Sequence, residues 1–275
     1  MIKAGLVSIT FRALSPVALI DLATRAGLRG IEWGGDIHVP HGNLARAHEV
    51  GNQTRDAGLQ VAAYGSYYRV GVSETSAEPL IFESVLETAR ELDAPLIRVW
   101  AGNLASAQAD EAHWNRVRTD ALRIAEWSAR ERIAVAYEYH GGTLTDSRAA
   151  TQRLLKQTSH SNLGILWQPP SDATLEERLQ SLQEVLPHLL NLHVFQWRQT
   201  AAGKIERCVL EEGENEWPKY FEALRASPRD HWALLEFVRD DTEAALLDDA
   251  RTLRRWIESE NARVSQATKS GLKVL

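Results

Sequence analysis

Eight short apolar segments, each followed by a longer stretch of mixed polarity, restrict the fold of this chain more than any other feature. Their starts are spaced by roughly 26 to 42 residues, the length of one strand followed by one helix. The segments are Ala4–Ile9, Gly30–Trp33, Leu59–Tyr64, Pro95–Trp100, Ile133–Tyr139, Leu163–Trp167, Leu190–Phe195 and Trp232–Val238. Buried parallel strands read as continuous apolar runs, so these segments are predicted to be parallel strands covered on both faces.

The intervening stretches carry the signals of helices. Ser15 followed by Pro16 is a typical helix start, and Gly27 is a typical helix end. Near the C-terminus, apolar residues recur at steps of three and four, as on one face of a helix. These residues are Leu246, Ala250, Leu253 and Ile257. The chain therefore alternates strands with helices.

Eight such pairs are the number of a single (β/α)8 TIM barrel, which we predict for residues 1–258. A doubly wound sheet is the alternative. It is disfavoured because no glycine-rich phosphate turn follows the first strand. Residues 259–275 are polar with weak periodicity and are expected to form a C-terminal tail, either a frayed end or an arm for oligomer contacts.

Charge and cysteine content exclude several classes of protein. Lys and Arg number 31 against 37 Asp and Glu, a net charge of −6 that argues against a broad nucleic-acid surface. The single cysteine, Cys208, excludes an internal disulfide and a Cys-rich zinc site, and it fits a reducing compartment. No apolar run is long enough to span a membrane, and the first residues do not read as a secretory signal. A cytoplasmic protein is expected.

Polar residues at the strand ends are the candidates for chemistry, because TIM barrels build their active sites there. Glu138, His193 and Glu236 lie in three of the apolar segments, and Gln168 follows a fourth. Two carboxylates, an imidazole and an amide oxygen would suit Mn²⁺, Mg²⁺, Co²⁺ or Zn²⁺. The alternative is that each glutamate pairs with an arginine or faces solvent, although buried carboxylates are costly unless they are paired or bind a metal.

Tryptophan is also concentrated at the predicted strand ends. Four of the nine tryptophans lie there, namely Trp33, Trp100, Trp167 and Trp197. Aromatic faces suit the apolar face of a carbohydrate, so these four are candidate substrate contacts. Packing in the core is the alternative for each of them.

The segments around these residues resemble a known family. The chain is similar to the sugar phosphate isomerase/epimerase superfamily, the xylose-isomerase-like TIM barrels. That group includes ketose 3-epimerases, inosose dehydratases, 3-dehydroshikimate dehydratases and endonuclease IV. The resemblance is carried by GIEWGGDIHVPHG (30–42), YGSYYRVG (64–71), IRVWAG (97–102), YEYHGGTLTDS (137–147), LHVFQW (192–197) and LLEFV (234–238).

The resemblance implies metal ligands on the fifth to eighth strands, which map onto Glu138, Gln168, His193 and Glu236. The chain departs from the family pattern on the sixth strand, where the ligand is typically Asp and a His often follows three residues later. Here the sequence reads Gln168-Pro-Pro-Ser171. A neutral amide removes one negative charge, so weaker metal binding or a preference for another ion is expected.

The resemblance also implies roles for the polar residues. In ketose epimerases two glutamates exchange a proton next to a carbonyl while the metal stabilises the enediolate. Glu138 and Glu236 would hold these catalytic roles. Further substrate-binding candidates are His38, Tyr64, Ser66, His140 and Arg198. For the two histidines a structural role is the alternative, and for Arg198 an exposed surface charge.

The sequence thus predicts a metal-dependent isomerase or epimerase of carbohydrate metabolism that acts on a ketose, a polyol or a related small carbohydrate. A homodimer is expected because barrels of this family often pair. Two alternatives stay open. One is a metal-dependent dehydratase similar to the inosose or 3-dehydroshikimate enzymes, and the other is a non-catalytic sugar-binding barrel that has lost its metal.

Overall fold

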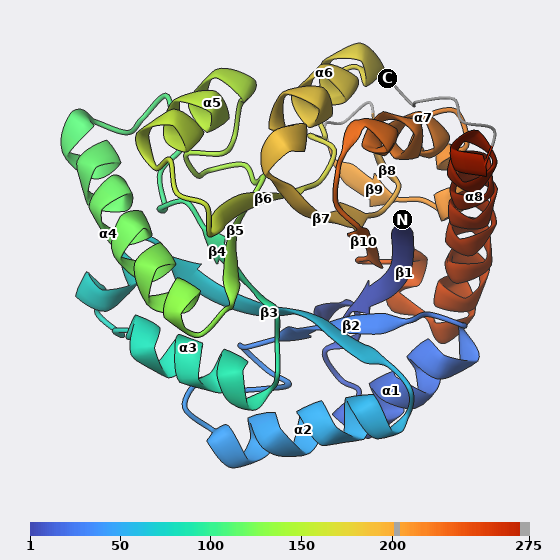
Figure 1. The fold of residues 1–275 in the computed structure, drawn as a ribbon, viewed down its shortest axis with the longest axis horizontal. Helices are drawn as coiled ribbons and strands as arrows, with labels where there is room; N and C mark the ends of the chain where they lie inside the picture. Colours follow the sequence, from blue (N-terminus) through green and yellow to red (C-terminus); the bar gives the residue numbers. More distant parts are fainter. Residues whose placement is uncertain (201–203, 270–275) are drawn as a thin grey trace.

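The computed structural model describes residues 1–200 and 204–269 of the chain. In this part, eight parallel strands close into one barrel, and eight α-helices surround it (Figure 1). The barrel strands are β1 (Ile2–Val7), β2 (Gly30–Gly34), β3 (Gln60–Arg69), β4 (Leu96–Trp100), β5 (Ala134–Glu138), β6 (Leu163–Trp167), β7 (Leu189–Val194) and β10 (His231–Leu235). The helices are α1 (Pro16–Arg25), α2 (Leu44–Asp56), α3 (Phe82–Glu91), α4 (Glu111–Arg130), α5 (Arg148–Gln157), α6 (Leu175–Val185), α7 (Trp217–Ala223) and α8 (Glu243–Lys269).

The strand order confirms the predicted (β/α)8 barrel. Neighbours in the barrel follow the order of the sequence, and β1 pairs with both β2 and β10. This closure excludes the doubly wound sheet, whose edge strands stay open. Because all strands are parallel, their C-terminal ends meet at one end of the barrel.

Two layers of apolar side chains hold the barrel and its helices together. Inside the barrel, small groups such as Ala63, Leu96, Ala136 and Leu166 fill the interior. A much larger cluster lies between the strands and the helices, and it includes Trp33, Tyr64 and Trp167. The strands are therefore buried on both faces, which is the reason that they read as continuous apolar runs.

Side-chain caps fix the starts of several helices. Ser15 accepts a hydrogen bond from the backbone N–H of Ala18, and Pro16 is the first residue of α1, as predicted. In α6, Thr174 and Glu177 form a reciprocal capping box. Gly27 follows α1 with a φ of +68°, a conformation that favours glycine. None of the described helices has the length and apolar character needed to span a bilayer.

Two features differ from the sequence-based expectation. A short antiparallel hairpin, β8 (Trp197–Gln199) with β9 (Ile205–Arg207), follows β7. In addition, α8 continues without interruption past the expected boundary after residue 258. Asn261 on this extension bonds both backbone groups of Ile2, with Nδ2 to the carbonyl at 2.9 Å and Oδ1 to the amide at 3.0 Å. Residues 259–269 are thus joined to the barrel, whereas 270–275 lie outside the described residues.

Candidate metal centre and active site

Three side chains that could bind a metal meet at the C-terminal end of the barrel. Glu138 is the last residue of β5, His193 lies on β7, and Glu236 follows β10 directly. One ligand atom from each of them lies within 4.8 Å of the others. The His193 Nδ1 is 3.2 Å from Glu236 Oε2 and 3.7 Å from Glu138 Oε1. All three residues are buried.

Two further charged residues, Arg98 on β4 and Glu32 on β2, complete this cluster. The Arg98 side chain is 2% exposed and lies 2.8 Å from Glu32 Oε1 and 2.6 Å from Glu138 Oε2. The other Glu32 oxygen is 3.2 Å from His193 Nε2. Such a carboxylate behind an imidazole fixes the ring and its tautomer in many metal sites. Sequence reasoning assigned neither residue, although a Glu and an Arg inside apolar strands were the available signal.

The backbone of β3 makes room for this ion pair. A Cβ atom on Gly65 would lie 2.7 Å from Arg98 Nη2 and 2.8 Å from Glu32 Oε1, so any side chain there would collide with the pair. The neighbouring Ser66 donates its hydroxyl to the Arg98 carbonyl at 2.7 Å and ties β3 to β4. Ser66 is fully buried, and its hydrogen bond helps to hold the backbone of Arg98 in place.

The buried charges shift one another's pKa values strongly. Burial alone would raise the pKa of Glu32, but the charges of His193 and Arg98 lower it to about 2. Burial would lower the pKa of His193, yet Glu236 and Glu32 raise it to about 10. The pKa of Glu138 is likewise lowered by Arg98 and His193 against the effect of burial. In the metal-free protein at neutral pH, Glu32 and Glu138 are therefore ionised and His193 is protonated.

The donor set fits a divalent cation. The side-chain oxygen of Gln168, directly after β6, is buried and has no hydrogen-bond partner among the described residues. Glu138 Oε2 accepts from Arg98 and Trp100, which leaves Oε1 on the side of His193. Carboxylate, imidazole and amide donors are suitable for Mn²⁺, Mg²⁺, Co²⁺ or Zn²⁺.

Aromatic side chains surround the cluster at the barrel mouth. The Trp100 indole donates to Glu138 at 2.5 Å, and its ring lies 5.1 Å from His140 and 5.3 Å from Tyr67. Trp197 stacks on Phe195 at 4.0 Å, and its buried indole N–H has no partner in the part of the chain that the structure describes. These rings remain candidates for substrate contact. Tyr67 has a φ of +56°, a costly conformation for a residue other than glycine.

A cavity of about 550 Å³ lies near the ends of β1 and β10. Its wall includes Thr10 and Phe237, and Phe237 comes directly after Glu236. The Thr10 hydroxyl accepts from the Phe237 backbone at 3.1 Å and fixes this segment, whose φ of +52° is again unusual for a residue with a side chain. The described residues that line this cavity include none of the five charged residues of the cluster, so the cavity is connected to the site only through the chain segment at Phe237.

The structure places several other predicted residues away from the mouth. The indoles of Trp33 and Trp167 donate to Thr54 on α2 and Ser181 on α6, and both tryptophans are 0% exposed. The Tyr64 hydroxyl bonds the Val39 carbonyl at 2.9 Å and is equally buried. These three side chains therefore pack in the core, and they are not part of the substrate site proposed below.

His38 and Arg198 also have internal partners. His38 Nδ1 is 3.0 Å from Ser8 Oγ, and burial lowers the pKa of this imidazole. Arg198 is exposed on the β8–β9 hairpin and pairs with Glu206 and Glu212. Arg198 is thus an exposed surface charge, the alternative role that the sequence left open for it.

The fold and the cluster together define a TIM barrel with a candidate metal centre at the C-terminal ends of its strands. The family model described as "Xylose isomerase-like TIM barrel" matches residues 20–259 of the chain. The chain therefore belongs to this family, as its sequence motifs predicted.

Known proteins similar to this chain include both dehydratases and epimerases. It is 26% identical to a 3-dehydroshikimate dehydratase of Bacillus anthracis over 91% of this chain and 96% of that protein. The solved structure of a probable 3-DHS dehydratase involved in petrobactin synthesis, also from Bacillus anthracis, superposes with a TM-score of 0.74 at 22% identity, covering 92% of this chain and 99% of that one. A D-psicose 3-epimerase from Clostridium cellulolyticum superposes with a TM-score of 0.64 at 14% identity, covering 98% and 99%.

Proposed function

We propose that this chain is a metal-dependent enzyme that removes the proton next to a carbonyl group of a small polyhydroxylated compound, and that it then eliminates water. The convergence of Glu138, His193 and Glu236 within 4.8 Å carries this proposal. These three residues, with the oxygen of Gln168, would hold the divalent cation. The cation, when bound, offsets the negative charge that develops on the carbonyl oxygen.

The hydrogen bonds at the cluster distinguish its two glutamates. Glu138 Oε2 accepts from the Arg98 guanidinium and from the Trp100 indole. These bonds stabilise the ionised form and make Glu138 a weak base. Glu236, which is 5% exposed, accepts no hydrogen bond from an arginine or an indole among the described residues, and its charged neighbour at short distance is His193, at 3.2 Å. We therefore assign proton abstraction to Glu236 and a binding role to Glu138.

One base is sufficient for elimination. Glu236 takes the proton from the carbon next to the carbonyl, and the electron pair of that C–H bond forms a new carbon–carbon double bond. The C–O bond at the next carbon breaks, and the departing hydroxide takes the proton from Glu236 and leaves as water, which returns Glu236 to its carboxylate form. Epimerisation instead requires a second group that returns a proton to the opposite face. We therefore favour dehydration over epimerisation. The 26% identity to a dehydratase supports this preference.

Epimerisation is the second candidate, because epimerases are among the structural neighbours. The test uses two substrates, 3-dehydroshikimate and D-fructose, with Mn²⁺ added. Dehydration produces a conjugated product with a new ultraviolet absorbance and a loss of mass, whereas epimerisation gives an isomer of equal mass. We expect the absorbance change, and formation of an isomer alone would overturn the preference for elimination.

Substitution of the two glutamates tests the assignment of the base. We expect Glu236→Gln to lower turnover by about 10²- to 10⁴-fold at any Mn²⁺ concentration, the usual contribution of a general base. Glu138→Gln should weaken Mn²⁺ binding, and high Mn²⁺ should restore most of its turnover. The exposed Glu87→Gln on α3 is the matched control. Equal and unrescued losses in both variants would instead indicate a two-base reaction.

A further inference from the structure

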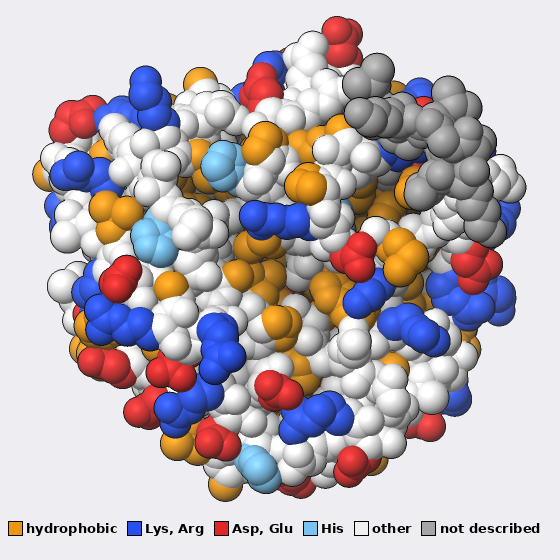
Figure 2. Space-filling model, in the orientation of Figure 1, with side chains coloured by type: hydrophobic (Ala, Val, Ile, Leu, Met, Phe, Trp, Pro, Cys, Tyr) orange, Lys and Arg blue, Asp and Glu red, His pale blue; other side chains and the backbone are white. Residues whose placement is uncertain are grey.

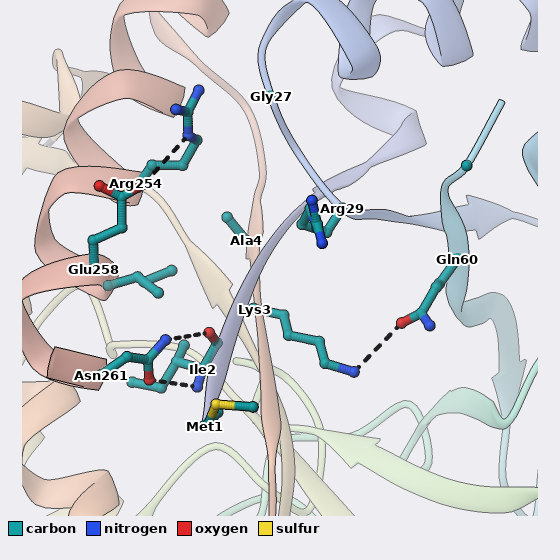
Figure 3. A pocket seen from close by; sticks show the side chains of 12 residues that line it. Met1, Ile2, Lys3, Ala4, Gly27, Arg29, Gln60, Arg254, Glu258 and Asn261 are labelled. Atoms are coloured by element: carbon teal, nitrogen blue, oxygen red, sulfur yellow. Dashed lines mark hydrogen bonds and ion pairs between the residues drawn. The ribbon is translucent and has the colours of Figure 1, made fainter. Parts of the chain in front are cut away.

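A second cavity lies at the opposite end of the barrel from the metal centre. It has a volume of about 680 Å³ and lies between the first residues of β1, β2 and β3 and the second half of α8. Figure 3 shows its residues from close by, with Lys3 and Arg29 on the strand side and Arg254 and Glu258 on α8. Figure 2 shows this face of the molecule, where Lys and Arg side chains border a central hollow.

The cavity is positively charged in a chain that is negatively charged overall. Its wall contains the cations Lys3, Arg29 and Arg254 and one carboxylate, Glu258, a formal charge of +2 in a chain of net charge −6. The ammonium of Met1 also reaches the cavity, but it already pairs with Asp230. This excess of positive charge would raise the local concentration of anions.

None of the three cations has a close carboxylate partner among the described residues. The Lys3 Nζ lies 3.4 Å from the amide oxygen of Gln60 and 5.2 Å from the centre of the Trp232 ring. Arg254 donates to the Ala26 carbonyl at 3.2 Å, and its Nε is 4.0 Å from Glu258. The guanidinium of Arg29 has no hydrogen-bond or ion-pair partner among the described residues. Unlike most arginines of this chain, it is therefore free to bind an external group.

The backbone that carries these side chains is rigid. The Arg29 amide donates to the Ala4 carbonyl at 2.8 Å, and its carbonyl accepts from the Gln60 amide at 3.0 Å, so the residue is held between β1 and β3. Asn261 binds both backbone groups of Ile2 and joins α8 to β1 (Figure 3). A ligand would meet cations on fixed supports, which lowers the entropy cost of binding.

We propose that this cavity is a binding site for a small dianion, such as a phosphate group, held by Lys3, Arg29 and Arg254. A dianion matches the formal charge of the wall, and guanidinium groups bind phosphate oxygens with paired hydrogen bonds. The site lies on the opposite end of the barrel from the catalytic cluster, so the proposal is independent of the proposed reaction.

Titration calorimetry with inorganic phosphate at pH 8, where it is a dianion, tests this site in EDTA and at constant ionic strength. We expect saturable binding to the wild type. In the double variant Lys3→Gln/Arg29→Gln the dissociation constant should rise by at least about tenfold, because two partly exposed ionic contacts with the anion are lost. The matched control is Arg118→Gln/Lys156→Gln, which removes the same charges from exposed positions on α4 and α5. The control should bind like the wild type.

Two results would overturn the proposal. One is the absence of saturable binding by the wild type, and the other is equal affinity in the wild type and the double variant, which would place the anion elsewhere. If the double variant fails to fold, Arg29→Gln alone takes its place. The Arg29 side chain is exposed and has no partner in residues 1–200 and 204–269, so we expect this substitution to leave the fold intact.

Discussion

Glu138 divides its two carboxylate oxygens between two tasks. Oε2 accepts from Arg98 and Trp100, while Oε1 lies toward His193, where a cation would bind. For a buried glutamate, pairing with an arginine and binding a metal are competing explanations. The two oxygens of Glu138 are placed so that one residue can do both. The proposed difference in role between Glu138 and Glu236 depends on this asymmetry.

Glu32 is expected to act on the metal through His193. Its Oε2 lies 3.2 Å from His193 Nε2, the ring nitrogen that points away from Glu138 and Glu236. In Glu32→Gln the imidazole loses its anionic partner, and we expect Mn²⁺ affinity to fall by about 10- to 100-fold. Paramagnetic resonance of free Mn²⁺ measures this change, with Glu87→Gln as the control. Unchanged affinity together with a lower melting temperature would show that Glu32 is structural only.

Gln168 is the position at which this chain differs from the family pattern, and Gln168→Asp tests what that difference does. A carboxylate would add a negative charge beside the other ligands, so we expect Mn²⁺ affinity to rise by about tenfold or more. The control Gln157→Asp adds the same charge at an exposed position, the last residue of α5 on the outside of the barrel. Equal affinity in Gln168→Asp and the wild type would mean that the Gln168 side chain does not reach the metal.

At the scale of elements, the strands were predictable because each barrel strand is apolar on both faces. The run Leu163–Trp167 coincides with β6, and the other seven runs each overlap a barrel strand. The hairpin of β8 and β9 was not predictable, because its short strands are mostly exposed and polar. A continuous apolar run also hides which side chains face inward. Strand alternation places Trp167 outward and its neighbour Gln168 inward, and for this reason two of the four tryptophans were assigned to the wrong side.

Asp249 on α8 makes the stability of that helix dependent on pH. The Asp249 side chain is 4% exposed and accepts a hydrogen bond from the Leu210 backbone N–H at 2.8 Å. Burial raises the pKa of Asp249 to about 6, and the hydrogen bond opposes this rise only in part. Because the folded pKa exceeds the unfolded value, the folded state binds more protons, and stability falls as pH rises from about 4 to 6. Asp249→Asn keeps an acceptor and cannot ionise.

We therefore expect Asp249→Asn to be more stable than the wild type by about 1–2 kcal/mol at pH 8 and equally stable at pH 4. Urea unfolding at the two pH values measures the difference. Asp248→Asn, on the exposed neighbouring residue, should change stability by less than about 0.5 kcal/mol. A gain of the same size at both pH values would contradict an ionisation effect.

At the scale of the whole molecule, the candidate ligands come from strands that are far apart in the sequence and adjacent in the barrel. β5, β6, β7 and β10 are consecutive neighbours in the folded barrel, although about 100 residues separate the first of them from the last in the sequence. The unfolded chain offers no such cluster. Metal binding must therefore favour the folded state, and its free energy adds to the stability of the entire barrel.

This coupling gives a prediction that needs no substrate. Mn²⁺ at about 100 times its dissociation constant should stabilise the protein by about 2.7 kcal/mol and raise its melting temperature by about 5–10 °C relative to protein in EDTA. Glu138→Gln should lose most of this increase, while Glu87→Gln keeps it. If wild-type protein melts at one temperature in Mn²⁺ and in EDTA, then Arg98 and protonated His193 already satisfy the carboxylates. The barrel would in that case be a sugar-binding relative without a metal, and the proposed elimination would lose its support.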